Sequence, residues 1–172
     1  MDEEGNERVE GPLALRDAFF NPDALVSNGG LDPFFRGMGV QVQQEMDAKI
    51  VDDVRNFLFG PPGAGGLDLA AININRGRER GLPDFNAYRV ALGLTPYSDF
   101  SDISDDAEVV AALEANYSSI DDIDPWVGML AERHMDAALF GETVMAFMHL
   151  SLKKRSEPSL MSTISTSASR LG

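Results

Sequence analysis

A short basic run, Arg76-Gly77-Arg78-Glu79-Arg80, is the densest positive charge in the sequence. On a helix, Asn73, Arg76 and Arg80 fall at i, i+3 and i+7, which places one amide and two guanidinium groups along one face. Guanidinium groups bind carboxylate and phosphate groups through paired hydrogen bonds, so this pattern predicts an anion site. The alternative is a solvated face whose arginines pair with the chain's many carboxylates. The residues alone leave both interpretations open.

No other group of residues has the spacing of a known catalytic or metal site. The two histidines, His134 and His149, lie 15 positions apart without the spacing of a metal-binding pair, which favours surface or core roles. The acidic cluster Asp99–Glu108 lacks the residue order of a calcium loop, and Asp121–Asp124 favours a helix start. No G-x-S-x-G motif supports a serine nucleophile. We therefore predict no catalytic residue and no metal ligand.

Charge and composition narrow the function classes further. The 172 residues include 14 Lys and Arg against 28 Asp and Glu, a net charge of −14, which argues against nucleic acids and anionic lipids as partners. The absence of cysteine excludes disulfides, thiolate zinc sites and cysteine nucleophiles. With 44% hydrophobic residues, the chain is apolar enough to fold as one domain or as part of a larger one.

The sequence shows no membrane or export signal. Charged residues interrupt every apolar stretch before it reaches the roughly 18 residues of a membrane-spanning helix. The polar, acidic start lacks the basic and apolar parts of a signal peptide. We expect no membrane span, and we leave localisation open because a longer parent protein could still be secreted.

Hydrophobic periodicity predicts helices along most of the chain. The longest signal is an apolar stripe from Phe35 to Phe57, which predicts one helix of about 25 residues. Asp68 as N-cap, with Gly81 and Pro83 as stop signals, bounds the helix that carries the basic run. Further helices are expected within 13–26, 84–92, 109–117, 120–134 and 142–153, and loops at 28–30, 60–66 and 97–106.

No stretch alternates apolar and polar residues as a strand does, so we predict a mainly α fold. We expect an acidic, disordered lead-in at 1–12 and a helical domain at 13–150. The remainder, 151–172, contains seven serines and two threonines and is expected to be a disordered tail.

The segment Asp68–Arg89, which reads DLAAININRGRERGLPDFNAYR, resembles the animal haem peroxidase family, whose pattern there is D-L-x-A-x-N-x-x-R-x-R-D-H-G-L-P-x-Y-N-x-[WY]-R. Two further stretches match the family in order: Gly29–Gly37, GGLDPFFRG, and Ile123–Glu132, IDPWVGMLAE. The resemblance covers about 13–148, the later part of the family's catalytic domain. It implies a partial haem-peroxidase helical domain.

The resemblance implies an enzyme that uses haem and hydrogen peroxide to oxidise small electron donors, with a part in the response to oxidative stress. Asn73 matches the asparagine that accepts a hydrogen bond from the proximal histidine, which orients that axial ligand and makes it more basic. Arg76 matches the arginine that pairs with a haem propionate. Leu69 and Ile72 would be apolar lining near the proximal side.

The departures from the family are equally specific. The family's proximal histidine lies upstream of the residue matching Leu13, and its distal histidine, distal arginine and calcium site lie earlier still, so none is expected in this chain. His134 is not the expected iron ligand, and His149 remains a weaker alternative because its neighbours are apolar. Arg80 and Pro125 replace the family's usual histidine and a larger apolar residue. We expect a truncated fragment that is inactive alone; the alternative is a non-catalytic acidic helical interaction module.

Overall fold

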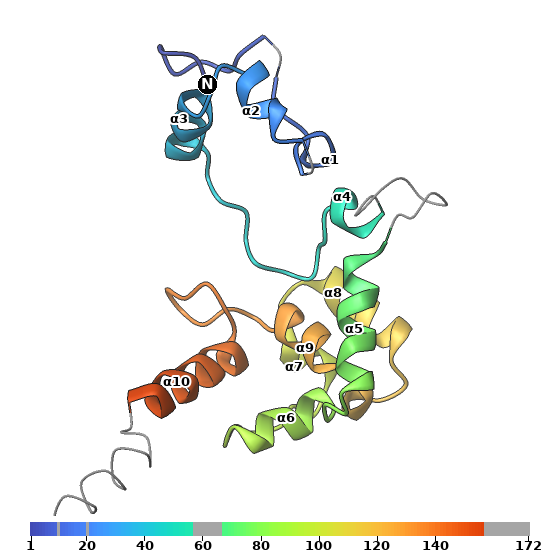
Figure 1. Cartoon of the computed structure of the whole chain (residues 1–172). Coiled ribbons are helices and arrows are strands. Elements are labelled where there is room, and N and C mark those ends of the chain that lie inside the picture. The colour runs from blue at the N-terminus through green and yellow to red at the C-terminus, as the bar shows by residue number, and fades with distance from the viewer. Residues whose placement is uncertain (10, 20, 57–66, 157–172) are drawn as a thin grey trace, which may run out of the picture. The chain divides into compact units, whose positions relative to one another are not determined.

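The computed structural model of the chain describes residues 1–9, 11–19, 21–56 and 67–156 (Figure 1). Its helices are α1 (Leu15–Ala18), α2 (Asp23–Ser27), α3 (Asp32–Val40), α4 (Asp52–Arg55), α5 (Leu69–Glu79), α6 (Phe85–Ala91), α7 (Phe100–Ile103), α8 (Ala107–Asn116), the 3-10 helix η1 (Ile120–Asp122), α9 (Pro125–Ala131) and α10 (Glu142–Ser156). These ranges contain no strand, and an isolated bridge joins His134 to Gly141. The prediction of a mainly α fold is confirmed. The loop expected at 60–66 lies outside the described residues, as does 157–172 of the tail expected at 151–172. The first six residues of that expected tail continue helix α10.

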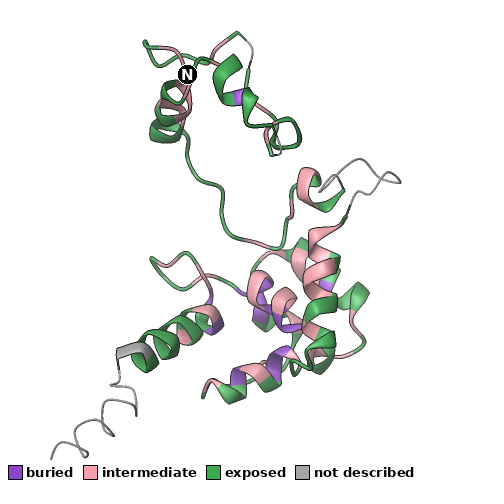
Figure 2. Cartoon of the chain, viewed as in Figure 1, coloured by how far each residue is buried: buried purple, intermediate pink, exposed green. Residues whose placement is uncertain are grey.

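The chain divides into two compact units, and the first consists of Met1–Glu45 and Lys49–Arg76. Its helices are short, and a salt bridge of 2.6 Å from Arg16 Nη2 to Asp53 Oδ1 links α1 to α4. Among the described residues of this unit Ala24 alone is buried, as the mostly green and pink ribbon shows (Figure 2). The described residues of this unit therefore contain no buried hydrophobic cluster.

The prediction of one long helix from Phe35 to Phe57 is wrong. The chain leaves the helical conformation after Val40, is non-helical through Val51 and resumes as one short turn, α4. Two glycines, Gly37 and Gly39, weaken the helix near this break. The stripe also finds no surface to pack against, since Phe35 is 62% exposed. Most protein helices are stabilised by packing of their apolar face against another surface. Without such a surface, the apolar periodicity was not enough to form the long helix.

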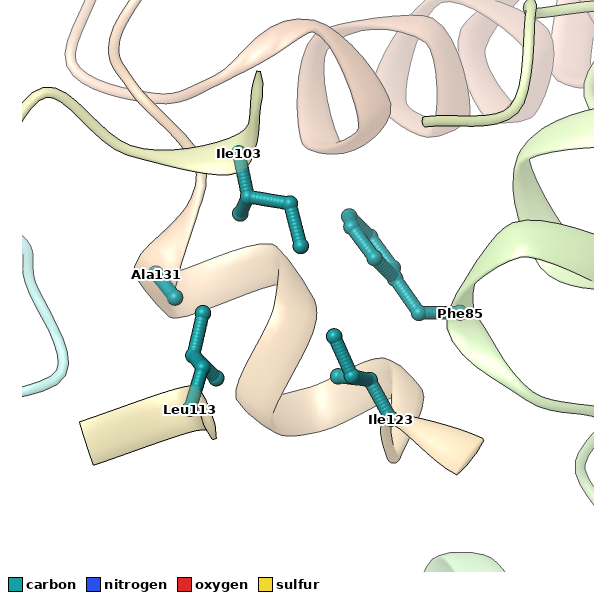
Figure 3. Close-up of a cluster of buried hydrophobic side chains, with 5 residues drawn as sticks. All are labelled: Phe85, Ile103, Leu113, Ile123 and Ala131. Carbon is teal, nitrogen blue, oxygen red and sulfur yellow. The ribbon is translucent and has the colours of Figure 1, made fainter. Parts of the chain in front are cut away.

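The second unit, Met46–Ala48 and Gly77–Gly172, contains the hydrophobic core. Five side chains from α6, α7, α8, α9 and the segment before α9 converge there (Figure 3): Phe85, Ile103, Leu113, Ile123 and Ala131. Phe85 is completely buried, and α9 approaches its ring at Gly128 so closely that a Cβ there would lie 2.2 Å from the Phe85 Cγ atom. This close approach lets α6 and α9 pack directly on each other.

Local signals set both ends of α5, the helix that carries most of the basic run, and the start of α6, as predicted. The Asp68 carboxylate accepts a hydrogen bond of 3.1 Å from the Ala71 amide at the start of α5. The chain turns after α5 at Gly81, whose φ of +67° suits glycine. The Asp84 carboxylate then accepts from the Ala87 amide at 2.8 Å and begins α6. Sequence-local chemistry therefore sets both ends of the helix that carries Asn73 and Arg76.

The predicted helices at 109–117 and 142–153 are confirmed as α8 and α10. Helix α10 is attached to the second unit through its first turn, where the Glu132 carboxylate accepts hydrogen bonds from the backbone amide and the hydroxyl of Thr143, both at 2.8 Å. Its later apolar side chains stay accessible, with Phe147 48% exposed. No helix in the described part of the chain is both long and apolar enough to cross a bilayer.

Candidate functional site

The four residues predicted to contact a cofactor share one face of α5. Leu69, Ile72, Asn73 and Arg76 are spaced i, i+3, i+4 and i+7, so they lie along one side of this helix. The first three side chains are partly buried and Arg76 is exposed. The face therefore presents two apolar side chains, a carboxamide and, at its open end, a guanidinium.

The side chains of Asn73 and Arg76 have no hydrogen-bond or ion-pair partner within the described part of the chain. A carboxamide oxygen accepts a hydrogen bond, and a guanidinium binds a carboxylate through paired N–H donors. The face can therefore accept a proton-bearing nitrogen at Asn73 and an anionic group at Arg76, one helical turn apart.

Within the basic run, Arg78 differs from Arg76 because its side chain is paired. Arg78 donates from Nε to Asp124 Oδ1 at 2.8 Å and from Nη2 to Oδ2 at 2.7 Å, and the Tyr117 hydroxyl donates to the same Oδ2 at 2.9 Å. The hydrogen bond from Arg78 holds the pKa of Asp124 below its usual range. Burial and the neighbouring Asp124 raise the pKa of Tyr117 to about 12. The carboxylate-paired interpretation is thus correct for Arg78. The anion-site interpretation remains for Arg76 and Arg80, whose exposed side chains have no partner among the described residues.

Comparison with known proteins identifies the family of this chain. The family model of animal haem peroxidases matches residues 1–156. Peroxinectin A of Dictyostelium discoideum is 45% identical over 132 residues, which cover 77% of this chain and 24% of that protein. The solved structure of peroxidase A from the same organism superposes with a TM-score of 0.77 at 39% identity, covering 85% of this chain and 29% of that one. This chain belongs to the animal haem peroxidase family.

More distant members give the same result at lower identity. The peroxidasin homologue pxn-2 of Caenorhabditis elegans is 36% identical over 149 residues, which cover 84% of this chain and 11% of that protein. This member of the haem peroxidase family thus spans less than a third of the length of each relative named here.

The residues present on α5 fit a haem group. Haem carries carboxylate-bearing propionates and a large apolar ring, and its iron takes an axial imidazole in many proteins. Arg76 has the chemistry to bind a propionate, Leu69 and Ile72 supply apolar contact, and the Asn73 amide oxygen can accept the ring N–H of an imidazole. This face of α5 therefore has the chemistry that contact with haem requires.

Neither of the two histidines belongs to α5. His134 Nε2 is 2.8 Å from the backbone oxygen of Met46, a contact inside the second unit. His149 is exposed on α10. Over residues 1–9, 11–19, 21–56 and 67–156, no three His, Asp or Glu side chains gather in a way that could hold a metal ion.

The acidic clusters begin helices. The sequence predicts this for Asp121–Asp124, but the loop predicted at 97–106 is wrong at Phe100–Ile103, which form α7. The Asp99 carboxylate accepts from the Ser101 amide at 2.9 Å, and Asp102 accepts in return from the Asp99 amide at 3.0 Å, a capping box on α7. Asp106 caps α8 in the same way, and Asp124 is the N-cap residue of α9. These carboxylates are used by backbone amides and by Arg78.

Sequence reasoning missed a buried polar network around Arg89. This side chain, 2% exposed, pairs with the Glu132 carboxylate and donates at 2.7 Å to both the Thr143 hydroxyl and Glu142 Oε2. The Tyr97 hydroxyl donates to Glu132 at 2.9 Å, and burial followed by the Glu132 charge raises the pKa of Tyr97. Arg89 and Glu132 both fall inside the family-like stretches, but they are 43 residues apart, so spacing could not show that they pair.

Proposed function

We propose that this chain is the part of a haem peroxidase that binds one side of the haem through α5, in an enzyme that reduces hydrogen peroxide and oxidises small electron donors during oxidative stress. The observation that supports this most directly is that Asn73 and Arg76 lie on one face of α5. Neither side chain has a partner among the described residues. Bound haem would supply the redox-active iron.

Each residue on the face has a separate role in this proposal. Arg76 binds a haem propionate through charge-assisted hydrogen bonds, which anchors the edge of the group. Leu69 and Ile72 cover the apolar ring and exclude water near the axial ligand. The Asn73 amide oxygen accepts the N–H of the axial imidazole, fixes its orientation and raises its basicity.

We further infer that the axial imidazole comes from a histidine outside these 172 residues. The chain contains only two histidines, and His134 already has its Nε2 atom at hydrogen-bond distance from Met46. His149 is exposed on α10. The family's calcium site is likewise proposed to lie outside this chain.

Haemin titration of the purified chain tests the Arg76 and Asn73 roles separately. Haemin binding is followed by the Soret band in the presence of free imidazole, which replaces the missing axial ligand. Arg76→Ala should weaken haemin binding about three- to fivefold, the range of an exposed charge pair. Asn73→Ala should weaken imidazole binding to the haemin complex about three- to tenfold, the range of one hydrogen bond.

Two controls isolate these effects. N-methylimidazole has no N–H to donate, so Asn73→Ala should leave its binding unchanged. Asn75 is exposed on the same helix, about 200° around the axis from Asn73, so Asn75→Ala should behave as wild type with both ligands. Equal effects of the changes at positions 73, 75 and 76 would refute the proposal and favour a non-catalytic helical module.

Turnover provides an independent check. With haemin alone the chain should oxidise guaiacol no faster than free haemin, because positioned acid–base groups that contribute about 10²–10⁴-fold are not supplied by its residues. His134→Ala and His149→Ala should leave this rate unchanged. Peroxide-dependent turnover that one of these changes abolishes would show that the iron ligand lies within this chain.

A further inference from the structure

The Arg78–Asp124 pair is held on a rigid base. Asp124 is 9% exposed and is the N-cap residue of α9, where its backbone oxygen accepts from the Gly128 amide at 2.9 Å. The Tyr117 hydroxyl also donates a hydrogen bond to the Asp124 carboxylate. Two parallel N–H···O bonds from Arg78 then constrain the guanidinium in its plane as well as in distance. The last turn of α5 is therefore fixed in orientation by a pre-positioned acceptor.

Arg78 lies on the side of α5 opposite to the face with Asn73 and Arg76. Successive residues of an α-helix are rotated by about 100°, so Arg78 is about 180° from Leu69 and about 200° from Arg76. A salt bridge at this position cannot contact a group bound on the other side. It anchors one side of the helix and thereby fixes the orientation of the opposite face, which carries Asn73 and Arg76.

We propose that Arg78 and Asp124 are positioning residues for the haem-binding face of α5. This inference rests on the proposed function. The pair fixes the rotation of the final helical turn, and the continuous backbone hydrogen bonding of α5 carries that rotation to Arg76 and Asn73. Arg78 therefore acts on haem binding only through the residues on the opposite face.

If the Arg78–Asp124 salt bridge only stabilised the fold, replacing Arg78 would lower the free energy of unfolding without a specific effect on haemin affinity. Arg78 is 62% exposed, and exposed ion pairs add little to global stability. Replacing it should leave overall unfolding nearly unchanged while loosening α5 locally. Arg133, which is 45% exposed and pairs with Asp105 at 3.0 Å in the same unit, is a matched arginine away from α5.

The test combines amide hydrogen exchange with a double-mutant cycle on haemin affinity, using the full chain with free imidazole. Arg78→Ala should speed exchange of the α5 amides and weaken haemin binding about threefold, while Arg133→Ala should change neither. Arg78→Lys keeps the charge but not the paired geometry, so it should restore only part of the affinity. In an Arg76→Ala background, Arg78→Ala should cause a smaller loss of affinity than in the wild type, because only the contribution through Asn73 remains.

The possible failures are distinguishable. If Arg76→Ala leaves haemin affinity unchanged, the proposed function fails and the positioning role falls with it. If Arg76→Ala weakens binding but Arg78→Ala affects neither exchange nor affinity, the proposed function stands and the positioning role is refuted. An Arg78→Ala loss of equal size with and without Arg76 would also refute it, because the effect would not pass through Arg76.

Discussion

Gly128 should tolerate no side chain, because it lies directly against the ring of Phe85. A Cβ built at this position lies 2.2, 2.4 and 2.6 Å from three ring atoms of Phe85, far inside van der Waals contact. Phe85 is 0% exposed and is surrounded by the core of the second unit, so its ring has no open space into which to move. Gly128→Ala therefore forces α6 and α9 apart or distorts the ring.

The size of the effect follows from two opposing contributions. Replacing glycine by alanine inside a helix favours folding by about 1 kcal/mol. Overpacking a core costs about 1–3 kcal/mol, and three close contacts place this site at the upper end. We expect Gly128→Ala to lower the free energy of unfolding by about 1–2 kcal/mol. With a typical urea dependence, the midpoint falls by about 0.7 M.

Urea unfolding followed by Trp126 fluorescence measures this effect, since the only tryptophan lies two residues before Gly128 on α9. Gly77→Ala is the matched control, because a Cβ there meets only a Leu82 methyl carbon at an ordinary 3.6 Å. That control should be neutral or stabilising by up to about 1 kcal/mol. A Gly128→Ala variant that unfolds at the same urea concentration as wild type, or higher, would refute the packing argument.

Three further predictions concern the second unit. Glu132→Gln should destabilise it by about 1.5–3 kcal/mol in urea unfolding, because the buried Arg89 guanidinium keeps only the half-exposed Glu142 as its counter-charge; a change below about 1 kcal/mol would contradict this. Ala137→Gly should stabilise it by up to about 1 kcal/mol in the same assay, since Ala137 has a φ of 58°, and a loss of stability would argue against strain there. The raised pKa of Tyr117, about 12, means that its contribution to stability is full below pH 10 and is lost as pH rises towards 12, because the unfolded chain ionises first. Tyr117→Phe should flatten that alkaline loss, and an unchanged profile would assign it to other groups.

The sequence alone was informative wherever the deciding interactions are local. The carboxylate of Asp68 and the freedom of Gly81 act within one turn of the residues they affect, so both ends of α5 were predictable. The face shared by Asn73 and Arg76 followed from helical spacing, and their roles toward haem came from the family resemblance and remain proposals. The carboxylates that cap α7 are equally local, but the Ser- and Asp-rich stretch at 97–106 was predicted to be a loop, so this four-residue helix was missed.

Only the tertiary structure decided which charges pair and which helices persist. Arg78 and Asp124 are 46 residues apart, and Arg89 and Thr143 are 54 apart, so no local pattern distinguishes Arg78 from Arg76. The helix predicted from Phe35 to Phe57 was wrong for a related reason. Apolar spacing shows which side of a helix could be buried, but the helix forms only where another surface supplies the burial, and that surface is determined by the fold.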